Sequence, residues 1–247
     1  MILLYRCLMK ITVVLLTWQR ISSLKTTLAR LANQTHKHFD VHISNSNEKA
    51  SQTVEKYAKY FEGTLSITVS HDSNDLHAYR RLTVARELAK GGTEVILFID
   101  DDVTISNSYI EDIMAAYESN SYSSAYAWIF TNNGQDYYKH RKRVRDNLNK
   151  IHYCGSAVSV IDASIFLDDD LFVHPEEAYL MEDLWLSYFA QQVKGWKLKY
   201  AHVNNLSISG SDANALYKKI MREKKINGTP DKADLLRKLV SDYGWKL

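Results

Sequence analysis

Three consecutive aspartates follow a strongly apolar segment near the middle of the chain. Asp100, Asp101 and Asp102 come directly after residues 95–99, which read Val-Ile-Leu-Phe-Ile. This segment predicts a buried strand, and open α/β sheets bind ligands where such strands end. Side chains alternate along a strand, so Asp100 and Asp102 can converge on one hard divalent cation, Mg²⁺ or Mn²⁺, that clamps the phosphates of a nucleotide. The alternative is a solvated turn or the acidic N-cap of a helix.

A second pair of carboxylates, Glu182 and Asp183, opens an expected helix over residues 181–193. A hydroxyl is a poor nucleophile at neutral pH, and a carboxylate within about 3 Å can accept its proton as attack proceeds. This pair is therefore the candidate general base. The alternative is that acidic residues in the first helical turn complement the helix dipole and do no chemistry.

The elements that must position these carboxylates alternate in the first half of the chain. Apolar, β-branched segments predict strands, and Gly63 and the Gly91-Gly92 pair indicate helix ends. Between the strands, apolar residues recur at helical spacing, as in Leu24, Leu28 and Leu31. This rhythm favours a mostly parallel sheet covered on both faces. The expected strands are residues 11–16, 41–44, 65–69 and 94–99.

The second half of the chain is less regular. Strands are expected over residues 125–130, 157–161 and 197–203, with a polar, basic stretch over 137–150 between the first two. Two C-terminal helices are expected, one with Ser211 as its N-cap and one with Thr229 as N-cap and Pro230 at its first position.

Composition excludes several classes of protein. The 247 residues are 45% hydrophobic, and their formal net charge of +2 selects neither nucleic acid nor an anionic membrane as partner. The chain has no run of about 18 uncharged apolar residues, so no transmembrane segment is predicted. Peripheral contact with a membrane stays possible. Cys7 and Cys154 lie far apart, which excludes a disulfide scaffold or zinc ribbon and suits a reducing, cytoplasmic location.

These segments together resemble a known family. Residues 95–103 resemble the strand and D-x-D motif of the GT-A glycosyltransferases, in particular the inverting family 2-like enzymes. Residues 11–20 are similar to the family's opening strand and Arg-containing loop, and Asn33-Gln34-Thr35 to the end of its first helix. The resemblance runs over roughly residues 9–205. It implies a Rossmann-like GT-A fold in one domain over residues 1–247, with a nucleotide-sugar half to about 103 and an acceptor half after it.

The resemblance also implies roles for particular residues. Asp183 would be the general base, and Glu182 would bind the acceptor or orient the helix. Mn²⁺ or Mg²⁺ would be held by Asp102, with Asp100 and His202 as further ligands. Asn45 stands where the family commonly has an aspartate that contacts uracil, although an ordinary polar turn is the alternative. The residues expected to contact the nucleotide sugar are Thr17, Arg20, Asn45, Arg80 (with Arg81 as the alternative), Asp100 and Asp101.

The expected substrates follow from the same resemblance. The donor would be a UDP-sugar, with dTDP- and GDP-sugars as alternatives, and the acceptor a saccharide or glycoconjugate, with no nucleic-acid partner. Cys154-Gly155-Ser156 resembles the family's acceptor-side loop. The basic run 139–145 could bind acceptor phosphate, anionic lipid or nucleic acid, or be a solvated face. Residues 207–212 form either a loop that orders over the donor or an ordinary connection.

Two other functions compete with this interpretation. A nucleotidyltransferase would share the fold and the acidic metal site, but it normally needs a glycine-rich phosphate loop after the first strand. This chain has Thr17-Trp18-Gln19-Arg20 there, and no glycine before Gly63. A catalytically dead nucleotide-sugar-binding module is disfavoured because Asp100, Asp102 and Asp183 are all present.

Overall fold

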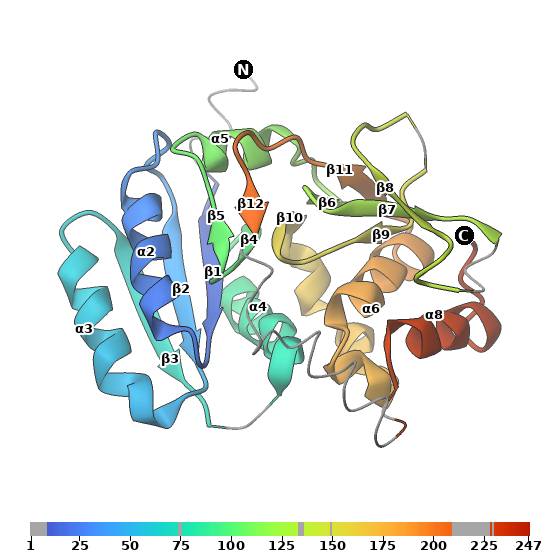
Figure 1. Cartoon of the computed structure of the whole chain (residues 1–247), viewed down its shortest axis with the longest axis horizontal. Coiled ribbons are helices and arrows are strands. Elements are labelled where there is room, and N and C mark those ends of the chain that lie inside the picture. Colours follow the sequence, from blue (N-terminus) through green and yellow to red (C-terminus); the bar gives the residue numbers. More distant parts are fainter. Residues whose placement is uncertain (1–8, 74–75, 133–135, 149, 209–227, 229) are drawn as a thin grey trace.

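A computed structural model describes residues 9–73, 76–132, 136–148, 150–208, 228 and 230–247. Its centre is a seven-stranded sheet with the strand order β11-β6-β10-β4-β1-β2-β3 (Figure 1). Neighbouring strands are parallel, except that β10 runs antiparallel to both β4 and β6. The expected mostly parallel sheet is therefore confirmed. The strands are β1 (Ile11–Thr17), β2 (Asp40–Asn45), β3 (Ser66–His71), β4 (Val95–Asp100), β6 (Ser121–Ser124), β10 (Val158–Asp162) and β11 (Lys197–Tyr200).

Helices cover both faces of this sheet because its central strands are apolar on both sides. Val13 and Leu97 belong to one buried cluster, whereas the next residues along the same strands, Val14 and Phe98, belong to the other. This is the alternation expected of a strand buried on both faces. The first cluster packs under α2 (Ile21–Ala32), α3 (Ser51–Phe61) and α5 (Tyr109–Ala115), and the second under α4 (Arg80–Lys90), α6 (Glu182–Tyr188) and α8 (Lys232–Ser241).

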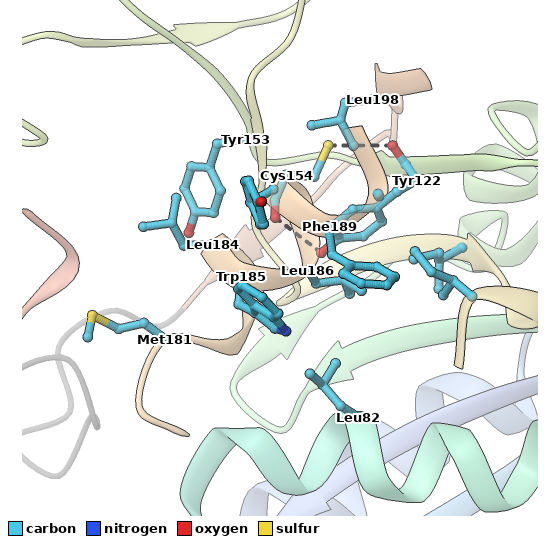
Figure 2. Close-up of a cluster of buried hydrophobic side chains, with 14 of the residues drawn as sticks. Leu82, Tyr122, Tyr153, Cys154, Met181, Leu184, Trp185, Leu186, Phe189 and Leu198 are labelled. Carbon is cyan, nitrogen blue, oxygen red and sulfur yellow. Dashed lines mark hydrogen bonds between the residues drawn. The ribbon is translucent and has the colours of Figure 1, made fainter. Parts of the chain in front are cut away.

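Helix α6 is buried along its whole length. Its apolar residues Leu184 and Trp185 pack in the second cluster with Tyr153, Cys154 and other residues that Figure 2 shows around it. A short π-helical turn (Phe189–Val193) continues α6, so the two together match the expected helix over residues 181–193. Because α6 begins inside the protein, the carboxylates in its first turn need charged or hydrogen-bonding partners there.

Five strands lie outside the central sheet, in two small sheets. β8 (Arg141–Val144), β7 (Ala127–Phe130) and β9 (Tyr153–Cys154) form a small antiparallel sheet in that order. β12 (Ser207–Ile208) pairs with β5 (Val103–Thr104), so the beginning of the segment 207–212 lies beside the residues that follow the acidic cluster. Residues 209–212 of that segment lie outside the described residues.

One strand of the second half was not predicted, and one expected helix start was wrong. The polar, basic stretch 137–150 contains the strand β8. The last helix has Asp231, not Thr229, as its N-cap, and it begins at Lys232. Asp231 accepts hydrogen bonds from the backbone N–H groups of Ala233 and Asp234, and the Asp234 carboxylate accepts one from the Asp231 N–H. This reciprocal cap fixes the first turn of α8. The other expected helix, capped by Ser211, lies outside the described residues.

The polar strand β6 is not predicted by hydrophobic patterning. Its serines are buried, but their hydroxyls are satisfied by backbone carbonyls: Ser123 Oγ donates to Ala116 O at 3.0 Å and Ser124 Oγ to Gly155 O at 2.6 Å. Small hydroxyl side chains can therefore occupy a buried strand without an unsatisfied polar group. Within the described residues, every helix is too short or too polar to span a membrane.

Candidate active site

A cavity of about 550 Å³ lies at the carboxyl ends of the two central strands. In open α/β sheets this edge is where ligands bind. Residues from both halves of the chain line it, so candidate donor and acceptor groups face a common space. The ends of β1 and β4 contribute Thr17 and Asp100, the small sheet contributes Trp128 and Tyr153, and the first turns of α6 and α8 contribute Asp183 and Lys232.

The three aspartates at the end of β4 do not share one partner. Arg20 pairs with Asp101 and Asp102, at Nη2–Oδ1 2.5 Å and Nη1–Oδ2 2.6 Å. Asp100 instead pairs with Arg81 and lines the cavity. Burial raises the pKa of Asp101 to about 7, against the opposing charge of Arg20, and burial also raises the pKa of Asp102. These directions reflect carboxylates crowded together in a partly dry site.

Arg81 is the buried centre of the site. Its guanidinium donates to Asp100, to Glu182 and, at 2.5 Å, to Ser156 Oγ. Ser156 Oγ in turn donates to Glu182 Oε1 at 2.8 Å. Burial alone would lower the pKa of Arg81, but the carboxylates of Asp100 and Glu182 raise it. Burial raises the pKa of Glu182 although Arg81 opposes it. Arg81 therefore joins the end of β4 to the start of α6.

The neighbouring Arg80 lies differently. Its Nη2 donates to Ser44 O at 3.1 Å and Thr17 O at 3.4 Å, so its guanidinium binds the ends of β1 and β2. Both arginines line the cavity. Of the two residues that the sequence left as alternatives, Arg81 is the one that touches the acidic groups.

Asp183 is held by two residues that the sequence did not point to. Lys232 Nζ donates to Asp183 Oδ1 at 2.9 Å and Oδ2 at 2.6 Å, and the Tyr153 hydroxyl donates to Oδ2. Lys232 Nζ also contacts Tyr153 Oη at 2.6 Å. Burial alone would lower the pKa of Lys232, but the facing Asp183 raises it. The candidate base is thus fixed in one orientation at the cavity wall.

Thr17 and Asn45 occupy contrasting positions. Thr17 lines the cavity, and its buried hydroxyl has no hydrogen-bond partner among the described residues. Asn45 is buried and does not line the cavity. Its amide donates to Asn47 O at 2.9 Å and approaches His71 Nδ1 at 3.0 Å, while its carbonyl accepts from Asn47 N. Asn45 therefore holds the turn after β2.

His202 is exposed and lies outside the cavity lining. Its ring hydrogen-bonds Asn204 at 3.1 Å, and Asn204 in turn binds Asp112. In the described part of the chain, no three His, Cys, Asp or Glu side chains group as a metal site. The expected three-residue set of Asp100, Asp102 and His202 is therefore not assembled in this structure, and the two aspartates remain as hard oxygen donors.

A Rossmann-like sheet of this topology, with an acidic cluster at the end of β4, is the arrangement expected of a GT-A glycosyltransferase. Residues 12–162 match the model of glycosyl transferase family 2, and the chain belongs to that family. A search of curated proteins gives no significant match.

Solved structures show the same fold at low sequence identity. The mannosyltransferase PcManGT from Pyrobaculum calidifontis, in complex with GDP-Man and Mn²⁺, has a TM-score of 0.61 at 12% identity, over 87% of this chain and 61% of its own. GalNAc-T7 with UDP, GalNAc and Mn²⁺ has a TM-score of 0.58 at 14% identity, over 96% and 55%. S. aureus TarS 1–349 with UDP has a TM-score of 0.51 at 18% identity, over 74% and 55%. The chain thus spans less than two thirds of each of these structures.

Proposed function

We propose that this glycosyltransferase moves a sugar from a nucleotide sugar, which we expect to be a UDP-sugar, to a hydroxyl of a saccharide or glycoconjugate, with inversion at the anomeric carbon. Residues up to about 103 would bind the donor and the later residues the acceptor. The observation that carries the proposal is that Asp100, at the end of β4, and Asp183, in the first turn of α6, line one cavity. The structures of similar fold solved with UDP, or with GDP-Man and Mn²⁺, support a nucleotide-sugar donor.

The donor end of the cavity suits a nucleotide diphosphate. Thr17 and Arg20 both line this end of the cavity, and Arg20 lies beside the acidic cluster. Asp100 and Asp102 would hold Mn²⁺ or Mg²⁺, because these ions commonly bind one or two carboxylates and complete their shell with phosphate oxygens and water. When bound, the ion supplies positive charge that stabilises the departing diphosphate.

The acceptor end supplies the proton acceptor. As the acceptor oxygen attacks the anomeric carbon, its proton passes to a carboxylate oxygen of Asp183, and the bond between the anomeric carbon and the donor phosphate breaks with its electron pair leaving on the phosphate. Oδ1 already accepts from Lys232 and the Leu184 N–H, and Oδ2 from Lys232 and Tyr153, so one of these hydrogen bonds must give way as Asp183 takes the proton. Lys232 and Tyr153 act as positioning residues.

Product analysis tests the proposed function against its alternative. The protein should release UDP from a UDP-sugar when a suitable acceptor is supplied. Release of pyrophosphate from UTP and a sugar 1-phosphate would instead identify a nucleotidyltransferase. Donor binding with neither reaction would identify a binding module. Nuclear magnetic resonance of the anomeric proton in the product tests inversion, since retention would contradict a single displacement with Asp183 as base.

Donor affinity should depend on a divalent cation. Without one, the acidic cluster, of which Asp100 and Asp101 line the cavity, repels a diphosphate of like charge. We expect calorimetry to give strong UDP binding with Mn²⁺ and much weaker binding with a chelator, and Asp102→Asn to weaken the Mn²⁺-dependent binding. Asp112→Asn, which removes a carboxylate outside the cavity, is the control. Equal affinity with Mn²⁺ and with chelator would contradict the metal assignment.

A further inference from the structure

Arg141 is a cation of the cavity wall without a carboxylate partner among the described residues. It begins β8 and lines the cavity on the side of the small sheet. The other arginines and the lysine there are already engaged: Arg20 with Asp101 and Asp102, Arg81 with Asp100 and Glu182, and Lys232 with Asp183. Arg80 binds the carbonyls of Thr17 and Ser44. A half-buried guanidinium that faces a cavity in this way is available for an anion that enters from outside.

Aromatic rings hold the Arg141 guanidinium in place. Its central carbon lies 4.7 Å from the ring centroid of Tyr137, 5.8 Å from that of Trp128 and 5.9 Å from that of Tyr138. One of its N–H groups donates to the Tyr137 hydroxyl at 2.8 Å. A guanidinium carries five N–H donors, so those that Tyr137 does not use can bind the two oxygens of a carboxylate or phosphate.

The same wall offers a platform for a sugar ring. Trp128 lines the cavity and is half-buried, and it stacks between Tyr126 and Tyr153 with ring centroids 6.2 and 4.9 Å apart. The part of the Trp128 indole that lines the cavity can pack against the apolar face of a saccharide. The Tyr153 hydroxyl contacts Asp183, so the aromatic row leads from the candidate base to Arg141.

A second cation lies along the same strand. Side chains two apart on a strand share a face and are about 7 Å apart, so Arg143 accompanies Arg141 while Lys142 points the other way. The Arg143 guanidinium lies 4.4 Å from the ring centroid of Tyr126 and donates to Ala125 O at 3.3 Å. Arg141 and Arg143 together form a positive strip on the acceptor side of the cavity. Because the formal net charge of the whole chain is only +2, this strip is a local concentration of positive charge.

We infer that the acceptor is an anionic saccharide, whose carboxylate or phosphate binds Arg141 while a sugar ring packs on Trp128. This inference rests on the proposed function, since it assigns the acceptor class of the same cavity. Carboxylate and phosphate present the same pair of oxygens to a guanidinium, and the test below separates them.

Binding to an array of neutral, uronate-bearing and phosphate-bearing glycans tests this inference without any donor. The wild-type protein should retain anionic glycans, and the Arg141→Gln variant should bind them at least about tenfold more weakly, the effect of losing a charged hydrogen-bonded pair. Lys142→Gln removes the same charge from the opposite face of β8 and should bind as the wild type does. Comparison of binding to the uronate-bearing and phosphate-bearing glycans identifies which anion Arg141 binds.

Several outcomes would overturn the inference. Equal binding of neutral and anionic glycans, or no glycan binding, would do so. An equal loss in Arg141→Gln and Lys142→Gln would mean that the basic run attracts anions non-specifically. Binding of the wild type to phosphatidylserine vesicles or single-stranded RNA, but to no glycan, would assign the strip to a membrane or to nucleic acid. Failure of the proposed function is a separate result, because it appears as wild-type protein that releases no nucleotide with any acceptor.

Discussion

Replacement of Asp183 by Asn is expected to lower the turnover number by about 10²- to 10⁴-fold, the usual effect of losing a general base. The substitution removes the proton acceptor but keeps the shape, and the amide oxygen can still accept hydrogen bonds from Lys232 and Tyr153. Donor affinity should stay near that of the wild type, because Asp183 pairs with Lys232 and Tyr153 and is not one of the carboxylates proposed to hold the metal. Steady-state kinetics together with calorimetry of UDP binding measure the two effects separately.

The matched control is Asp242→Asn, which removes an exposed carboxylate just after α8 and should leave turnover unchanged. Thermal unfolding of both variants checks that any loss of activity is not a loss of fold. If Asp183→Asn turns over at nearly the wild-type rate, Asp183 only complements the helix dipole, and the base must be sought elsewhere, first at Glu182.

The central sheet and one end of the site could be predicted because they depend on local patterns. β1 and β4 are continuous apolar segments buried on both faces, and that signal alone places Asp100 where the sheet opens. The acidic first turn of α6 is also a local sequence signal, since Glu182 and Asp183 come directly before the apolar residues of that helix. Patterning fails for β6, where hydrogen-bonded serines take the place of apolar residues.

The partners of these carboxylates could not be predicted, because they come from distant parts of the chain. Lys232 is 49 residues from Asp183 in the sequence, and only the packing of α8 against α6 brings them together. One signal was available: Lys232 is the first residue of α8, where a cation is unfavourable beside the helix dipole unless a carboxylate compensates it. Similarly, the choice between Arg80 and Arg81 depends on the rotation of α4, which spacing does not fix.

Replacement of Arg81 by Met is expected to lower the free energy of unfolding by about 3–5 kcal/mol, the typical effect of removing one partner of a buried ion pair. Methionine keeps much of the volume of the arginine stem. It leaves the Glu182 carboxylate buried in α6 without its cation, and it separates Asp100 from its partner. Urea denaturation measures the loss of stability. If the unfolding free energy depends on urea concentration as steeply as in the wild type, the substitution does not act through the unfolded state.

Arg86→Met provides the matched control, because Arg86 lies on the same helix and pairs with an exposed carboxylate, Asp169. That exposed pair should contribute no more than about 1 kcal/mol. If the buried charge of Glu182 causes the instability of Arg81→Met, then adding Glu182→Gln should restore part of the lost stability, since the amide needs no cation. A single variant Arg81→Met as stable as Arg86→Met, or a double variant less stable than Arg81→Met, would contradict the role of Arg81 as the buried counter-charge that joins β4 to α6.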